Sequence, residues 1–150
     1  MFKRSRNPIA QLTIIWILCL ISSCSNSNDS SEFSLQKYTG KWFILNYWAE
    51  WCTPCIKEIP ELNELSARYP DKIAVAAVNF DRLQSDELFT ASRRVGINYE
   101  ILEGDPADQL RLSVPASLPT TYIYNPQGAL IAKLVGPQTA ESLLSKTNLR

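Results

Sequence analysis

Two cysteines, Cys52 and Cys55, stand three residues apart in the stretch NYWAEWCTPC, where their spacing could support chemistry. A Cys-x-x-Cys pair can hold a metal, form a structural disulfide or exchange electrons. The chain of 150 residues has no histidine, so it lacks the commonest metal ligand and the commonest acid–base side chain. Two thiols alone make a poor closed metal site. We therefore expect no metal and no cofactor, and a metal- or haem-handling module is the weaker alternative.

The residues around the pair predict a strand followed by a helix. The stretch 41–48 is apolar on both faces, as in a buried strand, and the residues after the pair predict an amphipathic helix to about Tyr69. Its expected apolar stripe is Ile56, Ile59, Leu62 and Leu65, with Lys57, Glu58, Glu61 and Glu64 off the stripe.

The start of this helix would give the two thiols different properties. Unpaired N–H groups and the helix dipole favour an anion, so the pKa of the Cys52 thiol should fall. Cys55 lies one turn inside the helix and should stay protonated. We therefore predict that Cys52 is the nucleophile and Cys55 the resolving thiol of a disulfide exchange.

The amino-terminal residues read as an export signal rather than as part of the fold. Three basic residues precede a mostly apolar stretch, 8–21, which is short for a membrane-spanning helix. The sequence Ile-Ser-Ser-Cys that ends at Cys24 resembles the bacterial lipoprotein signal, in which the cysteine is lipidated and the chain is cut before it. An uncleaved anchor, or a secretory signal cut elsewhere, is the alternative.

This interpretation divides the chain into a signal peptide (1–23), a lipidated Cys24 with a flexible tether (24–34) and one folded domain (35–150). It also removes Cys19 and Cys24 from consideration, so the domain has a single cysteine pair. Because exported compartments are generally oxidising, we expect that pair as a disulfide at rest.

The rest of the domain predicts an α/β fold. We expect a second buried strand at 72–80, parallel to the first, a helix at 85–95 and a short helix from Asp105 to Leu112. A hairpin of strands 120–124 and 129–135 and a final helix capped by Thr139 should follow. The result is a mixed central sheet with helices on both faces. A formal net charge of zero and no basic stripe give no indication of nucleic-acid binding.

Taken together, these features resemble the thioredoxin family. WAEWCTPC resembles its Trp-Cys-x-Pro-Cys active site, Pro60 its kinked helix, Leu118-Pro119-Thr120 its cis-proline loop and Gly136 the glycine after its last strand. The added stretch between the second and third strands and the predicted lipid anchor look most like the membrane-tethered TlpA/ResA-type branch. Those proteins are exported thiol–disulfide oxidoreductases, some of which serve cytochrome c maturation.

The resemblance implies roles for residues near the pair. Pro119 would be cis and would let the backbone of Leu118 pair with a substrate peptide, Trp51 would shield Cys52, and the Thr53-Pro54 dipeptide would tune the redox potential. Because that dipeptide lacks the histidine of strongly oxidising relatives, a reductase is favoured. An oxidase or isomerase on the same fold, and a thiol peroxidase, remain alternatives.

Asn46 departs from thioredoxin, which carries a buried acid at this position to take the proton of the inner cysteine. The nearest replacement is Asp81, on the neighbouring strand end, although it could equally be a solvated residue or water could serve. The expected partners are protein disulfides, an unidentified membrane electron donor and the membrane itself, through lipid on Cys24. The expected location is the bacterial envelope, facing the periplasm, and Ser25 after the lipidated cysteine favours the outer membrane.

Overall fold

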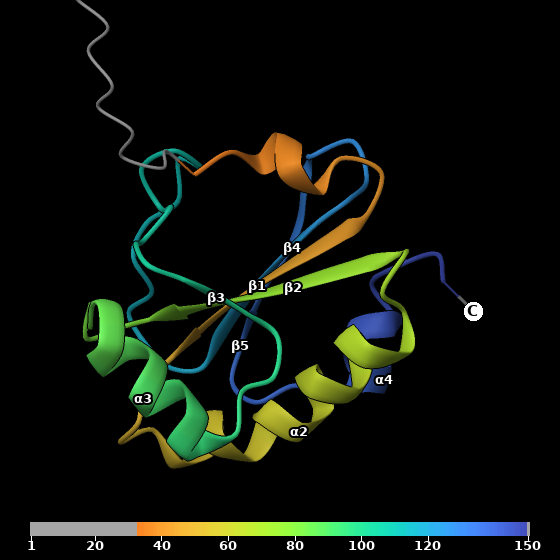
Figure 1. Ribbon diagram of the computed structural model, residues 1–150. Helices are drawn as coiled ribbons and strands as arrows, with labels where there is room; N and C mark the ends of the chain where they lie inside the picture. The colour runs from red at the N-terminus through yellow and green to blue at the C-terminus, as the bar shows by residue number, and fades with distance from the viewer. Residues whose placement is uncertain (1–32, 150) are drawn as a thin grey trace, which may run out of the picture. The chain divides into compact units, whose positions relative to one another are not determined.

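The computed structural model describes residues 33–149, and its five strands form one mixed sheet in the order β3-β2-β1-β4-β5 (Figure 1). The elements, in chain order, are the 3-10 helix η1 (Leu35–Tyr38), β1 (Trp42–Trp48), α2 (Thr53–Arg68), β2 (Ile73–Asn79), α3 (Ser85–Val95), β3 (Glu100–Leu102), β4 (Thr120–Tyr124), β5 (Leu130–Val135) and α4 (Ala140–Leu144).

The two apolar stretches predicted as buried strands form the centre of the sheet. All seven residues of β1 are buried, and β1 pairs in parallel with β2 on one side and antiparallel with β4 on the other. Helix α2 makes the crossover between the two parallel strands, and β4 and β5 form the predicted antiparallel hairpin. The carboxyl end of β1 therefore leads directly to the cysteine pair.

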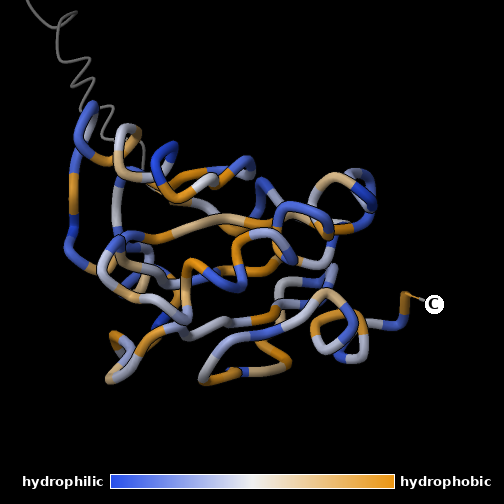
Figure 2. Tube along the Cα trace, turned by 90° about the horizontal axis from the view of Figure 1, so that it is seen from below, coloured by the Kyte–Doolittle hydropathy of each residue, from blue (hydrophilic) through white to orange (hydrophobic). Residues whose placement is uncertain are grey.

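The two faces of the sheet carry separate apolar cores. On one face, which we call the helical face, side chains of α2, α3 and α4 pack on Trp42, Ile44 and Trp48 of β1. On the opposite face, η1 and the loop through Leu110 and Leu112 cover Phe43, Leu45 and Tyr47. Figure 1 shows the three α-helices together below the sheet, and Figure 2 shows hydrophobic stretches of chain, in orange, running through the middle of the domain. The predicted α/β thioredoxin fold is thus confirmed, with α-helices on one face and a 3-10 helix on the other.

One local prediction was wrong, and one strand was missed. Residues 106–111 form a series of turns and not a helix, because Arg111 has a positive φ of 53° and Leu112 N–H donates to the Ala107 carbonyl rather than to Asp108. The Asp105 carboxylate nevertheless caps this segment by accepting from Ala107 N. Strand β3, which pairs in parallel with β2 at the edge of the sheet, was not expected at all.

The predicted helix at 85–95 and the predicted cap of the last helix are confirmed. Helix α3 covers that range and ends at Gly96, and Thr139 forms a reciprocal capping box with Ser142. The predicted signal peptide (1–23), Cys24 and nearly all of the tether lie outside the described residues. Within residues 33–149, no helix is long and apolar enough to cross a membrane.

Candidate active site

The cysteine pair lies at the junction between strand β1 and helix α2. Cys52 is the N-cap of α2, and its sulfur accepts a hydrogen bond from Cys55 N at 3.2 Å. Both cysteines are buried, Cys55 completely, and they form a disulfide, as predicted for the resting state. Thr53 and Pro54 occupy the first helical turn and are exposed, so they border the disulfide on the solvent side.

A small apolar surface surrounds the disulfide. Trp51 is 64% exposed and packs edge-on against Phe80, with ring centroids 6.4 Å apart, and Ile56, the residue after Cys55, is also exposed. The Trp51 indole N–H donates to both carboxylate oxygens of Asp81, at 2.9 and 3.1 Å. Asp81 therefore anchors the tryptophan next to Cys52, and its carboxylate lies at the surface.

The loop before β4 reaches the same edge of the sheet. The Leu118–Pro119 peptide bond is cis, as predicted, and Thr120 pairs with Tyr47 in the register of β4 on β1. Because β4 runs antiparallel to β1, the start of β4 lies beside the end of β1, where the cysteine segment begins. The Pro119 carbonyl accepts from Gly136 N at 2.9 Å, which ties this loop to the end of β5.

One helical turn after Cys55 lies a buried acid, Glu58, which was predicted to lie off the buried stripe of this helix. Glu58 is 1% exposed, and Ile56, expected to face inward, is exposed. One Glu58 oxygen accepts from Asn46 Nδ2 at 2.6 Å and the other accepts from Gln138 N at 2.9 Å. Burial raises the pKa of the Glu58 carboxyl from 4.5 to about 7, although both donors pull it down.

The buried residues of α2 are Cys55, Glu58, Ile59, Leu62 and Leu65, so the observed stripe keeps three of the four expected residues and replaces Ile56 with Cys55 and Glu58. A glutamate in such a stripe is unusual, since charged side chains are rarely fully buried without a partner. The sequence did offer one signal for this burial: residues three apart on a helix share a face, and Glu58 stands three residues after Cys55. Asp81 remains a predicted proton acceptor, and the structure adds Glu58 as a second candidate.

Asn46 now has a clear structural role. It is fully buried, and its Nδ2 donates to Glu58 and, at 3.1 Å, to Thr121 Oγ1 on β4. Asn46 on β1 thus holds the Glu58 carboxylate of α2 by a hydrogen bond. Within residues 33–149, no group of three or more His, Cys, Asp or Glu side chains could hold a metal ion.

Comparison with known proteins places this site in a family. Residues 21–133 match the model of the AhpC/TSA family. The chain belongs to that family. It is 34% identical over 124 residues to the thioredoxin-like protein YneN of Bacillus subtilis, and the aligned region covers 81% of this chain and 72% of YneN. With the Cys-x-x-Cys pair at a helix N-terminus, the chain is a thiol–disulfide oxidoreductase.

Two further relatives support the assignment. The thiol–disulfide oxidoreductase ResA of Bacillus cereus is 29% identical over 119 residues, covering 77% of this chain and 66% of ResA. A crystal structure described as a DsbF homologue from Corynebacterium diphtheriae superposes with a TM-score of 0.62 at 28% identity, covering 76% of this chain and 74% of that one. Both agree with the predicted resemblance to thioredoxin-like thiol–disulfide oxidoreductases.

Proposed function

We propose that the protein is an exported, lipid-anchored reductase of disulfides in envelope proteins, with Cys52 as nucleophile, Cys55 as resolving thiol and Cys24 as the lipid attachment site. The observation that carries the proposal is Cys52 at the N-cap of α2, beside exposed Trp51. Helix N–H groups and the helix dipole stabilise a thiolate at this position. The apolar surface around it suits a protein substrate, whose backbone would pair with Leu118 beside Pro119.

The reaction proceeds in two exchanges. The Cys52 thiolate attacks one sulfur of a substrate disulfide, so a mixed disulfide forms and the first substrate thiolate leaves. Cys55 then gives its proton to a nearby base, and its thiolate attacks the Cys52 sulfur. The second substrate thiolate leaves, the enzyme keeps the Cys52–Cys55 disulfide, and two electrons have passed to the substrate. An unidentified membrane electron donor must then reduce the pair.

We assign the proton of Cys55 to Glu58 in preference to Asp81. Glu58 is buried one helical turn after Cys55 on the same face of α2, and its pKa of about 7 suits proton uptake and release near neutral pH. Asp81 is exposed and already accepts from Trp51. In this proposal Asn46 holds the carboxylate in place, and Asp81 orients the indole.

The experiment is a trap in the native envelope. A full-length Cys55→Ala variant retains the nucleophile but cannot resolve the mixed disulfide, so it should accumulate covalent complexes that reductant dissolves. Mass spectrometry would identify the trapped partners. It would also show whether proteins of cytochrome c maturation are among them. The Cys52→Ala/Cys55→Ala variant is the control and should trap nothing. A Cys55→Ala protein that traps no more than this control would contradict the proposal.

Anchoring is tested separately. Cys24→Ala should release the protein from the membrane fraction, whereas an uncleaved anchor would hold both proteins there equally. In the wild type, separating inner from outer membranes would then test the outer-membrane location that Ser25 favours.

A further inference from the structure

A run of hydrogen bonds joins the buried Glu58 carboxylate to the loop that precedes β4. Gln138 N donates to one Glu58 oxygen at 2.9 Å, and the Gln138 side-chain amide donates to the Gly136 carbonyl at 2.9 Å. Gly136 N in turn donates to the Pro119 carbonyl at 2.9 Å. Gln138 therefore connects the carboxylate, through Gly136, to the Leu118–Pro119 loop.

The first link of this run depends on the charge of Glu58. A hydrogen bond to a carboxylate is roughly twice as strong as one to a neutral carbonyl oxygen. Burial raises the pKa of Glu58 to about 7, so this carboxyl gains and loses a proton near neutral pH. Gln138 N is thus held firmly when Glu58 is ionised and less firmly when it is protonated.

The Asn46 side of the carboxyl can accommodate the proton. Asn46 Oδ1 has no hydrogen-bond partner among the described residues, whereas its Nδ2 donates to Glu58 and to Thr121 Oγ1. After rotation of the amide, Oδ1 can accept from a protonated Glu58 and from the Thr121 hydroxyl. The other Glu58 oxygen then still faces Gln138 N, now as a neutral acceptor.

The elements around Glu58 carry other titratable groups, namely Lys57, Glu61 and Glu64 of α2, Tyr99 before β3 and Glu141 of α4. Within residues 33–149 none of these groups is hydrogen-bonded to Gln138, and Glu61 accepts from Ala140 N instead. Burial raises the pKa of the Tyr99 hydroxyl, so that group stays neutral. The charge that changes at the Gln138 hydrogen bond is therefore that of Glu58.

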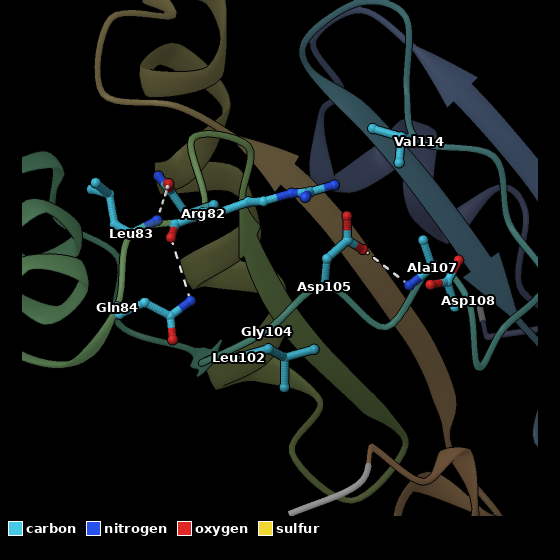
Figure 3. A pocket seen from close by; sticks show the side chains of 10 residues that line it. Arg82, Leu83, Gln84, Leu102, Gly104, Asp105, Ala107, Asp108 and Val114 are labelled. Carbon is cyan, nitrogen blue, oxygen red and sulfur yellow. Dashed lines mark hydrogen bonds between the residues drawn. The ribbon is translucent and has the colours of Figure 1, made fainter. Parts of the chain in front are cut away.

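The chain that leads into the Leu118–Pro119 loop borders open space. Val114 is 49% exposed and lines a pocket of about 270 Å³ at the carboxyl end of β2 and β3. Figure 3 shows Val114 and Leu83 on opposite sides of this pocket, with the Arg82 side chain extending between them. A weaker hold from Gly136 therefore leaves the loop room to shift.

We propose that Gln138 is a positioning residue that couples the charge of Glu58 to substrate binding at the Leu118–Pro119 loop, so that resolving the mixed disulfide also loosens the substrate. The inference rests on the proposed roles of Glu58 and of this loop. As the Cys55 proton moves to the Glu58 carboxylate, the negative charge moves to the Cys55 sulfur. After that sulfur attacks Cys52, the charge leaves with the substrate thiolate. The neutral carboxyl then holds Gln138 N less firmly, and the oxidised enzyme releases its product.

The coupling is tested first without substrate. In the oxidised full-length protein in detergent micelles, NMR follows the amide shifts of residues 136 and 138 between pH 5.5 and 8.5. Both should titrate with one midpoint in the wild type. Gln138→Ala keeps the backbone donor to Glu58 but removes the link to Gly136, so residue 138 should still titrate and Gly136 should lose most of its titration. Gln127→Ala, which truncates an exposed glutamine between β4 and β5, is the matched control and should leave both titrations intact.

Two results would overturn the coupling. A Gly136 amide that titrates equally in Gln138→Ala and wild type would mean that the field of the carboxylate acts on it directly. Titrations of both amides that persist in Glu58→Gln would mean that another group is responsible.

The effect on substrate is measured in a single turnover. Reduced full-length protein is mixed with excess scrambled ribonuclease A, and tryptophan fluorescence reports the oxidation of the protein. Between pH 8.5 and pH 6.0, the half-saturating substrate concentration should rise about fivefold more in wild type and Gln127→Ala than in Gln138→Ala. Titration of the substrate is common to all variants and cancels in this comparison. The maximal rate is not compared, because it also depends on the ionisation of Cys52.

An equal rise in Gln138→Ala and wild type would refute the coupling to substrate binding. Failure of the proposed function looks different: no variant would reduce ribonuclease A at either pH. The amide titrations would then still decide whether Gln138 couples Glu58 to the loop.

Discussion

Replacing Glu58 by glutamine should change how stability depends on pH. The fold raises the pKa of this carboxyl from 4.5 to about 7, so it binds a proton more tightly when folded than when unfolded. The stability that comes from this preference is fully present below pH 4.5 and is lost as the pH rises through 7. The shift of about 2.5 units corresponds to about 3 kcal/mol at 1.36 kcal/mol per unit.

Glu58→Gln keeps the size of the side chain and removes the titration. The glutamine can accept from Gln138 N with its oxygen, and its amide can donate to the unpartnered Asn46 oxygen once that amide rotates. We therefore expect similar stabilities at pH 4.5 and a variant that is more stable than wild type by up to about 3 kcal/mol at pH 8.5.

Urea unfolding of the oxidised proteins at five pH values between 4.5 and 8.5 measures this difference, and titrations common to both proteins cancel. Glu64→Gln, which removes an exposed carboxylate of the same helix, is the matched control and should follow the wild-type pH dependence. The reasoning would be refuted if the difference in unfolding free energy between Glu58→Gln and wild type stayed constant with pH. It would also be refuted if that difference favoured wild type more as the pH rises.

Three further substitutions test the contacts around the site. Gly136→Ala should lower the free energy of unfolding in urea by about 1–2 kcal/mol, because φ is +89° and an alanine is strained there. Nothing lies within 4 Å of the added methyl, so the loss would come from the backbone alone, and an unchanged midpoint would contradict this argument. Thr121→Val should cost a similar 1–2 kcal/mol by removing an acceptor of Asn46, and a neutral result would mean that this hydrogen bond is dispensable. Asp81→Ala should change stability by less than about 1 kcal/mol, since the residue is exposed, yet weaken protein-substrate binding by freeing the indole. Steady-state kinetics should show that loss as a higher KM with a protein substrate, and an unchanged KM would remove Asp81 from substrate binding.

The sequence was sufficient for features that depend on strong local patterns. The continuous apolar strands, the cysteine pair at the start of a helix and the capping by Thr139 follow from period, composition and turn chemistry. The cis bond before Pro119 followed only from the family resemblance, since cis X-Pro bonds are a small minority in folded proteins.

What the sequence did not reveal depends on long-range packing. Glu58 read as a surface residue because its partners, Asn46 and Gln138, are 12 and 80 residues away in the chain. Strand β3 has three residues and gains its pairing only from β2. The segment after Asp105 has helix-like signals, but its turns are held by contacts of Leu110 and Leu112 with the opposite face of the sheet.

The central claim is that the protein reduces disulfides, and one measurement tests this direction of electron flow most directly. The reduction potential of the Cys52–Cys55 pair, obtained by equilibrating the full-length protein with defined thiol–disulfide buffers, separates a reductase from an oxidase. We expect a value close to the roughly −270 mV of thioredoxin-like reductants. A potential near the roughly −120 mV of strong oxidants would contradict the proposed reductase.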